Sequence, residues 1–323
     1  MQGRPRLFLT RRLPQTVMDF LESHFHLVCN PSNRVLSKEE IIAGAKGCQA
    51  LLCLLTDTID AEVIDALPDL QVISNYAVGF DNIDLKAATR RNIPVCNTPG
   101  VLTMATADLT WALILAVSRR IAEADRFVRS GSFQGWDPLL FLGRGLSGLT
   151  LGIAGMGRIG QAVAKRAQGF DQRILYTKRS PLSSRESIDR AEHVSLDVLL
   201  QESDIVSLHL PYSSEVHHLI DQRAFAAMKS DAILINTARG ALVDEQALVV
   251  ALTGGQIGGA GLDVYEYEPA VHSGLLDLER VVLAPHIGSA TQQAREHMGL
   301  MAAENAFAVL SGGQPHSVAN PVG

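Results

Sequence analysis

The sequence predicts an α/β fold of two doubly wound domains with mostly parallel sheets. Three observations carry this prediction. A chain of 323 residues is too long for one ordinary core. Short apolar runs alternate with helical patterns along most of its length. In the middle, an apolar run leads into the glycine-rich stretch 155–160, and a helical pattern follows that stretch.

The first hundred residues predict a small βα array. Apolar runs predict strands at 6–9, 50–55, 72–74 and 93–96, and helical patterns cover 14–25, 38–45 and 61–66. One long helix is expected over 103–128, apolar on several sides and therefore buried between domains or subunits. The glycine-rich loop 131–148 carries Trp136, which either packs locally or reaches a partner subunit.

The second half repeats the alternation. Strands are expected before the glycine stretch and at 174–176, 205–210, 232–236, 259–264 and 281–284. Open parallel sheets bind ligands beyond the carboxyl ends of their strands, so the loops after these strands should carry the chemistry. From Gly312 onward we expect a loosely held terminus.

The glycine stretch predicts a dinucleotide site of the Rossmann type. Gly155 permits a tight turn, Gly157 lets the backbone approach a pyrophosphate, and Gly160 lets the helix pack closely on the strand. The N-terminus of the following helix presents N–H groups and a partial positive charge to the phosphates. The cofactor residues expected here are Gly155, Met156, Gly157, Arg158, Ile159 and Gly160.

The loop after the next strand indicates which dinucleotide binds. An NAD site places an acidic residue about 20 residues past the first glycine, but Lys178, Arg179 and Ser180 stand there. Two cations and a hydroxyl would pair with a 2′-phosphate, whereas a solvated basic loop is the plainer interpretation. Asp171 precedes the strand and would lie at its wrong end. The sequence therefore predicts a preference for NADP(H), with NAD(H) as the alternative.

Composition narrows the class of protein. A net charge of −6 spread along the chain argues against a nucleic-acid partner. The four cysteines show neither C-x-x-C nor zinc spacing, and are expected to be reduced and mostly buried in a cytoplasmic protein. We see no signal peptide and no apolar run long enough to span a membrane.

Four loops that follow predicted strands carry polar residues together. They are Asn75–Asp84, Asn236–Gly240, Asp263–Pro269 and Ala284–Ser289. As a set they resemble the D-2-hydroxyacid dehydrogenase family over nearly the whole chain. The run Ala105–Leu113 and the cations Lys178 and Arg179 are most similar to the glyoxylate/hydroxypyruvate reductase branch.

The resemblance implies a catalytic trio of Arg239, Glu268 and His286. An arginine can hold the carboxylate of a 2-oxo acid and polarise its carbonyl. A histidine can donate a proton to the alkoxide as hydride arrives, and an adjacent glutamate favours the protonated ring. No metal is implied, because Arg239 and His286 do the electrophilic work.

The resemblance also implies binding residues. Substrate would contact Asn75, Val78 and Gly79 together with Arg239 and His286. Asp263 would hold the nicotinamide carboxamide, with Gly288 and Ser289 beside the ring and Thr106 near a phosphate. The expected cofactor set is completed by Leu210, Pro211, Thr237, Ala238, Arg239 and His286.

The family's organisation implies that the chain folds back on itself. The substrate domain would be residues 1–101 plus 287–323, the cofactor domain 102–286, with a cleft between them. The long helix and the loop around Trp136 suggest a homodimer. A small 2-oxo or 2-hydroxy acid would be the substrate, and no nucleic acid or membrane would be a partner.

Two other functions remain open from the sequence. A relative with the same trio could oxidise phosphite or act on another D-2-hydroxy acid, including larger ones. A dinucleotide-sensing protein, similar to corepressors of this fold, would bind the cofactor without turnover. His193, His209, His217 and His218 have no catalytic partners in the sequence and are expected to be structural.

Overall fold

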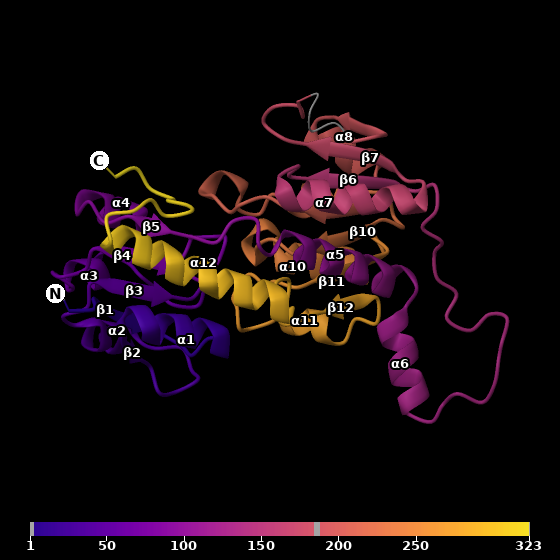
Figure 1. Ribbon diagram of the computed structural model, residues 1–323. Helices are drawn as coiled ribbons and strands as arrows, with labels where there is room; N and C mark the ends of the chain where they lie inside the picture. The colour runs from indigo at the N-terminus through magenta and orange to yellow at the C-terminus, as the bar shows by residue number, and fades with distance from the viewer. Residues whose placement is uncertain (1–2, 184–187, 323) are drawn as a thin grey trace. The chain divides into compact units, whose positions relative to one another are not determined.

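The computed structural model describes residues 3–183 and 188–322 (Figure 1). It divides into two compact units: one ends at Leu102 and resumes at Ser289, and the other is Thr103–Gly288. Each unit has its own sheet, and all strand pairs within these sheets are parallel. The predicted doubly wound α/β class is confirmed.

The first unit is a five-stranded sheet in the order β2-β1-β3-β4-β5. Its strands are β1 (Arg6–Leu9), β2 (His26–Cys29), β3 (Ala50–Cys53), β4 (Val72–Asn75) and β5 (Val95–Cys96). Its helices are α1 (Gln15–His24), α2 (Lys38–Ala45), α3 (Ala61–Asp65), α4 (Leu85–Arg90) and α12 (Gln292–Leu310).

Strand alternation explains how the two faces of this sheet are covered. Leu7 and Leu9 pack with residues of α1 and α12, whereas Phe8 packs with residues of α2. The C-terminal α12 thus lies over a sheet formed by the first hundred residues (Figure 1).

The second unit is a seven-stranded sheet in the order β12-β11-β10-β9-β6-β7-β8. Its strands are β6 (Thr150–Ala154), β7 (Arg173–Thr177), β8 (Ala191–His193), β9 (Ile205–Leu208), β10 (Ile233–Asn236), β11 (Gly259–Leu262) and β12 (Val281–Leu283). The sheet grows in one direction from β6 to β8 and in the other from β9 to β12. Its topological switch point therefore lies between β6 and β9.

Helices cover both faces of this second sheet. One core joins α5 (Thr103–Ser118) and α7 (Arg158–Ala167), and the other joins α8 (Leu196–Glu202), α9 (Gln222–Ala227), α10 (Glu245–Thr253) and α11 (Ser273–Leu276). Single 3₁₀ turns are η1 (Gln168–Phe170), η3 (Ser214–Val216) and η4 (Gly240–Leu242).

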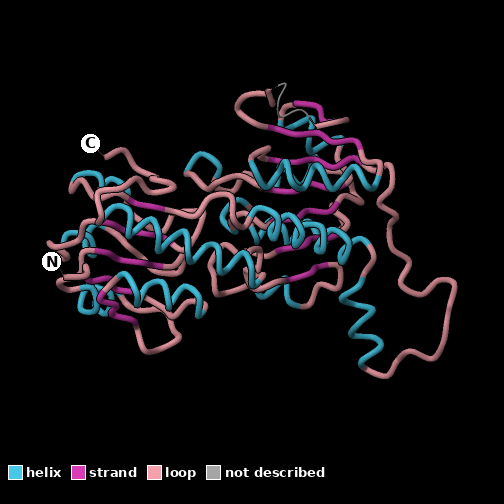
Figure 2. Tube along the Cα trace, viewed as in Figure 1, coloured by secondary structure: helices cyan, strands magenta, loops and turns pink. Residues whose placement is uncertain are grey.

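The predicted long helix over 103–128 is wrong. The chain forms α5, then breaks at Arg120, which has a left-handed φ of 55°, and α6 (Ile121–Arg129) starts anew. The end of α5 is capped from outside, because Arg144 N–H donates to the Ser118 carbonyl at 2.8 Å. The side chain of Arg120 bonds Glu123 in the first turn of α6. Figure 2 shows α6 and the loop that follows it projecting from the sheet of their own unit.

The expected loose C-terminus is also wrong over the described residues. Asn320 is buried, accepts a hydrogen bond from Val95 N–H at 2.8 Å and donates one to the Ile93 carbonyl at 2.9 Å. Ala319 N–H donates to the Val95 carbonyl. These bonds tie the terminus to β5, because that edge strand offers unpaired backbone groups.

The cysteines behave as expected. All four are free, and Cys48, Cys53 and Cys96 are buried. Over residues 3–183 and 188–322, none of the helices combines the length and the apolar character needed to cross a bilayer.

Candidate active site

The predicted site loops of the second unit leave its sheet along one edge. Six strands end at the same level of the sheet. Their last residues pair with one another across neighbouring strands, in the order Thr177, Ala154, Leu208, Asn236, Leu262 and Leu283. The residues that follow these strand ends include the glycine turn, Lys178, Leu210, Thr237, Asp263 and His286. Parallel strands therefore bring together residues spread over more than a hundred positions of sequence.

The glycine turn fits a dinucleotide. Gly155 has φ +100°, and a Cβ there would lie 2.6 Å from the His209 carbonyl oxygen. A Cβ on Gly160 would lie 2.2 Å from the Gly155 carbonyl oxygen. A Cβ on Gly157 would meet no atom within 4 Å. Two glycines are thus required by packing, and the third leaves open space at the N-terminus of α7, where a phosphate can approach the backbone.

The start of α7 carries no competing anion. Gly157 is its N-cap and supplies no side-chain cap, and no acidic residue lies in the first turn. Arg158 and Ile159 form that first turn, while Met156 is buried beneath it. Uncapped N–H groups and the helix dipole favour a phosphate at this position.

The basic loop directly follows β7. Gly155 N–H donates to the Thr177 carbonyl at 3.1 Å, so Lys178 leaves the sheet beside the glycine turn. Lys178 is half-buried, and Arg179 and Ser180 are exposed. Asp171 lies before β7, at the opposite end of that strand, as expected. Residues 178–180, which directly follow β7, therefore include no carboxylate.

Arg239 lies in a turn held by Asn236. The Asn236 amide donates to the Arg239 carbonyl at 2.8 Å, and its oxygen accepts from Ala238 N–H at 3.0 Å. The Arg239 guanidinium donates to the Ala238 carbonyl at 2.8 Å. Thr237, which precedes them, contacts Thr110 of α5 through their hydroxyls at 3.0 Å. The backbone that carries Arg239 is fixed before any ligand binds.

Glu268 and His286 form a hydrogen-bonded pair. His286 Nδ1 lies 2.8 Å from Glu268 Oε2, and the other carboxylate oxygen accepts from Tyr265 N–H at 3.0 Å. Both side chains remain about one-third exposed, at 28% and 31%. His286 has a left-handed φ of 54°, and its N–H donates to the Asp263 carbonyl at 2.9 Å. The geometry is that of an acid–base residue oriented by a carboxylate.

The charge state of Glu268 follows from its neighbours. Burial by itself raises the pKa of this carboxyl. The hydrogen bond and charge of His286, the Tyr265 N–H and the charge of Arg239 outweigh burial, so the pKa lies below its usual value. Glu268 is therefore an anion at neutral pH and a suitable partner for a protonated imidazole.

Asp263 braces the segment that follows His286. Its two carboxylate oxygens accept from Ile287 N–H and Gly288 N–H, each at 2.7 Å. Burial raises its pKa above the usual value, although these two N–H groups act in the opposite direction. Thr106 donates to the Gly288 carbonyl at 3.1 Å, which ties α5 to the same segment. Contact of these residues with a nicotinamide ring stays a prediction.

In the first unit, the loop after β4 carries the predicted substrate residues. The carbonyls of Val78 and Gly79 accept from the amides of Asn97 at 2.7 Å and Asn75 at 2.8 Å. The buried Asn75 amide also donates to Asn82 at 3.1 Å. The structure thus shows Asn75 as a brace of this loop, and its direct contact with substrate stays a prediction.

Sequence reasoning missed several supporting residues. Asn236 holds the Arg239 turn, and Tyr265 donates its N–H to Glu268 and its hydroxyl to the Ala284 carbonyl. Gly240 lets the two loops meet, because a Cβ there would lie 1.8 Å from the Tyr265 carbonyl carbon. The available signals were weak: a polar residue ending a strand and a glycine after an arginine.

One expectation about the other histidines is wrong. His218 does have a carboxylate partner, since its Nε2 lies 2.7 Å from Glu266 Oε1. The sequence separates them by 48 positions, and only the parallel sheet brings them together. His193 and His209 instead contact the Lys178 carbonyl and the Ser207 hydroxyl. Burial lowers the pKa of His209 to about 3, so that ring is neutral.

Comparisons with known proteins show which proteins the chain resembles. Residues 111–288 match the profile described as "D-isomer specific 2-hydroxyacid dehydrogenase, NAD binding domain". A glyoxylate reductase of Thermococcus litoralis is 48% identical over 321 residues, 98% of this chain and 97% of the relative. The solved TT0316 protein from Thermus thermophilus is 47% identical, with a TM-score of 0.91 over 97% of this chain and 99% of that one. An NADPH-dependent glyoxylate/hydroxypyruvate reductase from Sinorhizobium meliloti, solved with NADP and malonate, is 31% identical, with a TM-score of 0.88 over 98% and 97%.

Proposed function

The chain belongs to the D-isomer specific 2-hydroxyacid dehydrogenase family, enzymes that use nicotinamide dinucleotides, and from this premise we propose that it reduces a small 2-oxo acid with NADPH. Glyoxylate and hydroxypyruvate are the proposed substrates. The observation that carries the proposal is the His286–Glu268 pair on the same sheet edge as Arg239 and the glycine turn.

The proposed mechanism assigns one task to each member of the trio. The bound cofactor supplies a hydride to the carbonyl carbon. Arg239 binds the substrate carboxylate and polarises the carbonyl through its planar fork of donors. His286 donates the proton that the new alkoxide oxygen takes up, from Nε2, because Nδ1 is engaged with Glu268. Glu268 fixes the ring orientation and stabilises the imidazolium.

Backbone groups are assigned to the substrate carboxylate as well. Within the described chain, the N–H groups of Val78 and Gly79 donate to no protein acceptor, while their carbonyls are held by two asparagines. Fixed N–H donors of this kind suit an anion. On this proposal, the unit that contains β4 is the substrate-binding domain, and Thr103–Gly288 is the dinucleotide-binding domain.

NADP preference rests on the loop after β7. Lys178, Arg179 and Ser180 offer two positive charges and a hydroxyl where an NAD site presents an acid. The relative from Sinorhizobium meliloti, which is described as NADPH-dependent, adds support. The remaining cofactor contacts are assigned to the loop residues Leu210, Pro211, Thr237, Ala238, Asp263, Gly288 and Ser289, and to Thr106.

Oxidation of NADPH and NADH with glyoxylate, hydroxypyruvate, pyruvate and 2-ketogluconate tests this function. We expect NADPH turnover above ~1 s⁻¹ on glyoxylate and hydroxypyruvate. Replacing Lys178 by Asp together with Arg179 by Ala should shift the ratio of kcat/KM values toward NADH by at least about tenfold. Lys165→Ala, on the body of α7, is the matched control and should leave the ratio unchanged.

The outcomes separate the alternatives. An unchanged ratio of kcat/KM for NADPH and NADH in the double variant would refute the role of the basic loop. It would not affect the proposed mechanism. If no 2-oxo acid is reduced, phosphite oxidation is assayed next with the same cofactors. Tight cofactor binding without turnover on any of them would favour the sensing function.

The proposed assembly is a homodimer. The surface formed by α6 and the loop after it exposes seven large apolar side chains: Ile121, Val128, Phe133, Trp136, Leu139, Leu140 and Leu142. Soluble monomers rarely expose apolar groups gathered on one projecting segment. A second copy of the chain, which carries the same segment, is the partner that a two-fold symmetric contact requires.

A further inference from the structure

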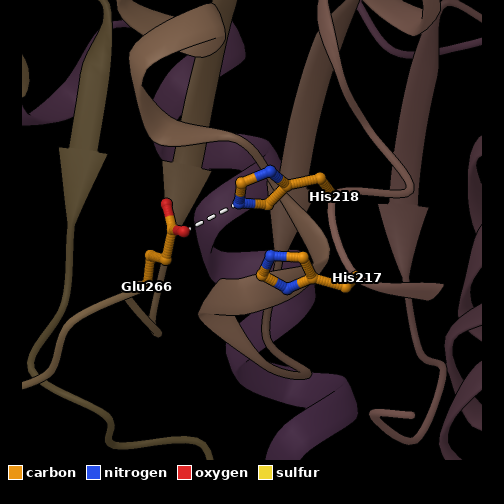
Figure 3. A group of neighbouring side chains, drawn as sticks. All are labelled: His217, His218 and Glu266. Carbon is orange, nitrogen blue, oxygen red and sulfur yellow. Dashed lines mark hydrogen bonds and ion pairs between the residues drawn. The ribbon is translucent and has the colours of Figure 1, made fainter. Parts of the chain in front are cut away.

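His217, His218 and Glu266 form a cluster that the proposed reaction does not use (Figure 3). Each offers one donor atom, and the three donor atoms lie within 4.8 Å of one another. His218 Nε2 bonds Glu266 Oε1 at 2.7 Å, and the His217 ring stacks on the His218 ring with centroids 4.0 Å apart. Figure 3 shows both rings on the same side of the glutamate.

The donor set is one that transition-metal ions prefer. Two neutral imidazoles and one carboxylate are the protein ligands of many zinc sites that keep a fourth position open. The Glu266 side chain is only 8% exposed, whereas His217 is exposed at the surface. The cluster is therefore a largely buried carboxyl group beside two rings, one of which can be reached from solvent.

Further acidic side chains lie beside the cluster. Glu245 is 3% exposed, and its Oε1 accepts the Glu266 N–H at 3.0 Å. Asp244 precedes Glu245 as the N-cap of α10. Carboxylates near the ligands are surroundings that suit a cation better than an anion.

Both sides of the cluster are already fixed. His218 N–H donates to the Ala241 carbonyl at 2.9 Å, and Ile220 forms a parallel bridge with Val243. On the other side, Glu266 N–H donates to Glu245 Oε1 at 3.0 Å. Such second contacts orient ligands before an ion arrives.

We infer that His217, His218 and Glu266 bind a divalent transition-metal ion of the zinc class, outside the reaction centre. Donor atoms around such an ion lie roughly 3.4 Å apart, at about 2.1 Å from the metal. The cluster must contract to reach that spacing. The two rings are also nearly parallel, at 20°, so the exposed His217 has to turn for its lone pair to converge with that of His218. Its contact with the Tyr212 hydroxyl, at 3.4 Å, is long enough to give way.

An ion at this site would connect two loops. His217 and His218 lie in the segment after β9, and Glu266 lies two residues before Glu268 in the loop after β11. Binding would therefore restrain the loop that orients the acid–base pair. The inference does not depend on which substrate is reduced, because its readout is binding.

Calorimetric titration of metal-free protein with zinc chloride tests the inference. We expect one Zn²⁺ per chain, with affinity lowered at least about tenfold by His217→Ala and by Glu266→Gln. His217 is exposed, so its variant keeps the fold. His316→Ala is the matched control: His316 is likewise exposed and paired with a glutamate, Glu304, at 3.0 Å, but lacks a second histidine.

Three results would overturn the inference. The first is a Kd for Zn²⁺ above 1 mM, a binding free energy weaker than about 4 kcal/mol. The second is an equal Zn²⁺ affinity in the His217→Ala variant and the parent protein. The third is a loss of Zn²⁺ affinity in the His316→Ala control as large as that in His217→Ala. Zinc held by the His286–Glu268 pair would survive in all three variants and so be recognised. A rise in the thermal midpoint with Zn²⁺, absent in His217→Ala, gives a second and independent readout.

Discussion

The imidazole of His286 owes its orientation to Glu268. Both carboxylate oxygens of Glu268 are engaged, one with His286 Nδ1 and one with Tyr265 N–H. Because the pKa of Glu268 lies below its usual value, the carboxylate stays charged at neutral and mildly acidic pH. Any loss of activity between pH 6 and 8 must therefore come from another group.

His286→Ala should lower kcat by about 10² to 10⁴, the usual contribution of a positioned acid, with little change in NADPH affinity. Glu268→Gln should lower it less, because the proton donor remains. Steady-state kinetics and fluorescence titration with NADPH measure the two quantities separately. Loss of cofactor affinity in the His286 variant would instead assign this residue a structural role.

The residue scale also shows what sequence can reveal about a site. Arg239, Glu268 and His286 were recognised as a set, through the resemblance of the four loops to a known family, and none of them is distinctive alone. Gly240 was not recognised, since its requirement comes from the approach of Tyr265 in the folded chain. Glu266 and His218 are likewise ordinary in sequence and meet only through the sheet.

The glycine turn is the element to which we assign cofactor binding, and its glycines have different roles. A methyl group on Gly160 would lie 2.2 Å from the Gly155 carbonyl oxygen, whereas a methyl group on Gly157 would meet open space. Close packing requires a glycine at position 160, and on the proposed function position 157 is a glycine because it leaves room for a phosphate.

Gly157→Ala should therefore impair cofactor binding, whereas Gly160→Ala should impair stability. We expect Gly157→Ala to keep the thermal midpoint and to weaken NADPH binding at least about tenfold, because its methyl group fills the space left for a phosphate. Gly160→Ala should lower the midpoint itself, since α7 must move off β6. Thermal unfolding with and without NADPH distinguishes them. Equal effects in both variants would contradict this division of roles.

Elements with clear apolar patterns were predictable, and partly polar ones were not. The buried strands β3, β9 and β10 stand out as apolar runs. The edge strands β2 and β8 contain no fully buried residue, so they lack that pattern and escaped prediction. The break between α5 and α6 escaped as well, because Arg144, whose N–H caps α5 from the loop, lies more than twenty residues away.

At the scale of the molecule, each unit has its own parallel sheet and its own pair of cores. The alternation of strands and helices predicted the class, and the apolar run before the glycine turn predicted β6. The return of α12 to the first sheet was expected from family resemblance and not from any local pattern. Long-range pairing of this kind is set by tertiary packing, which propensity does not encode.

The segment formed by α6 and the loop after it is the proposed homodimer surface, and this assembly can be tested by mutation. Trp136 is 85% exposed and Leu139 is 75% exposed, and both lie in the loop that follows α6. Aromatic anchors dominate protein interfaces, so Trp136→Ala should weaken the homodimer by about 2 kcal/mol, roughly thirtyfold in Kd. Leu276→Ala removes a similarly exposed apolar side chain from α11 and should leave the dimer unchanged. Sedimentation equilibrium across a dilution series gives both constants, and a parent protein that is monomeric at micromolar concentration would contradict the assignment of this surface to a second copy.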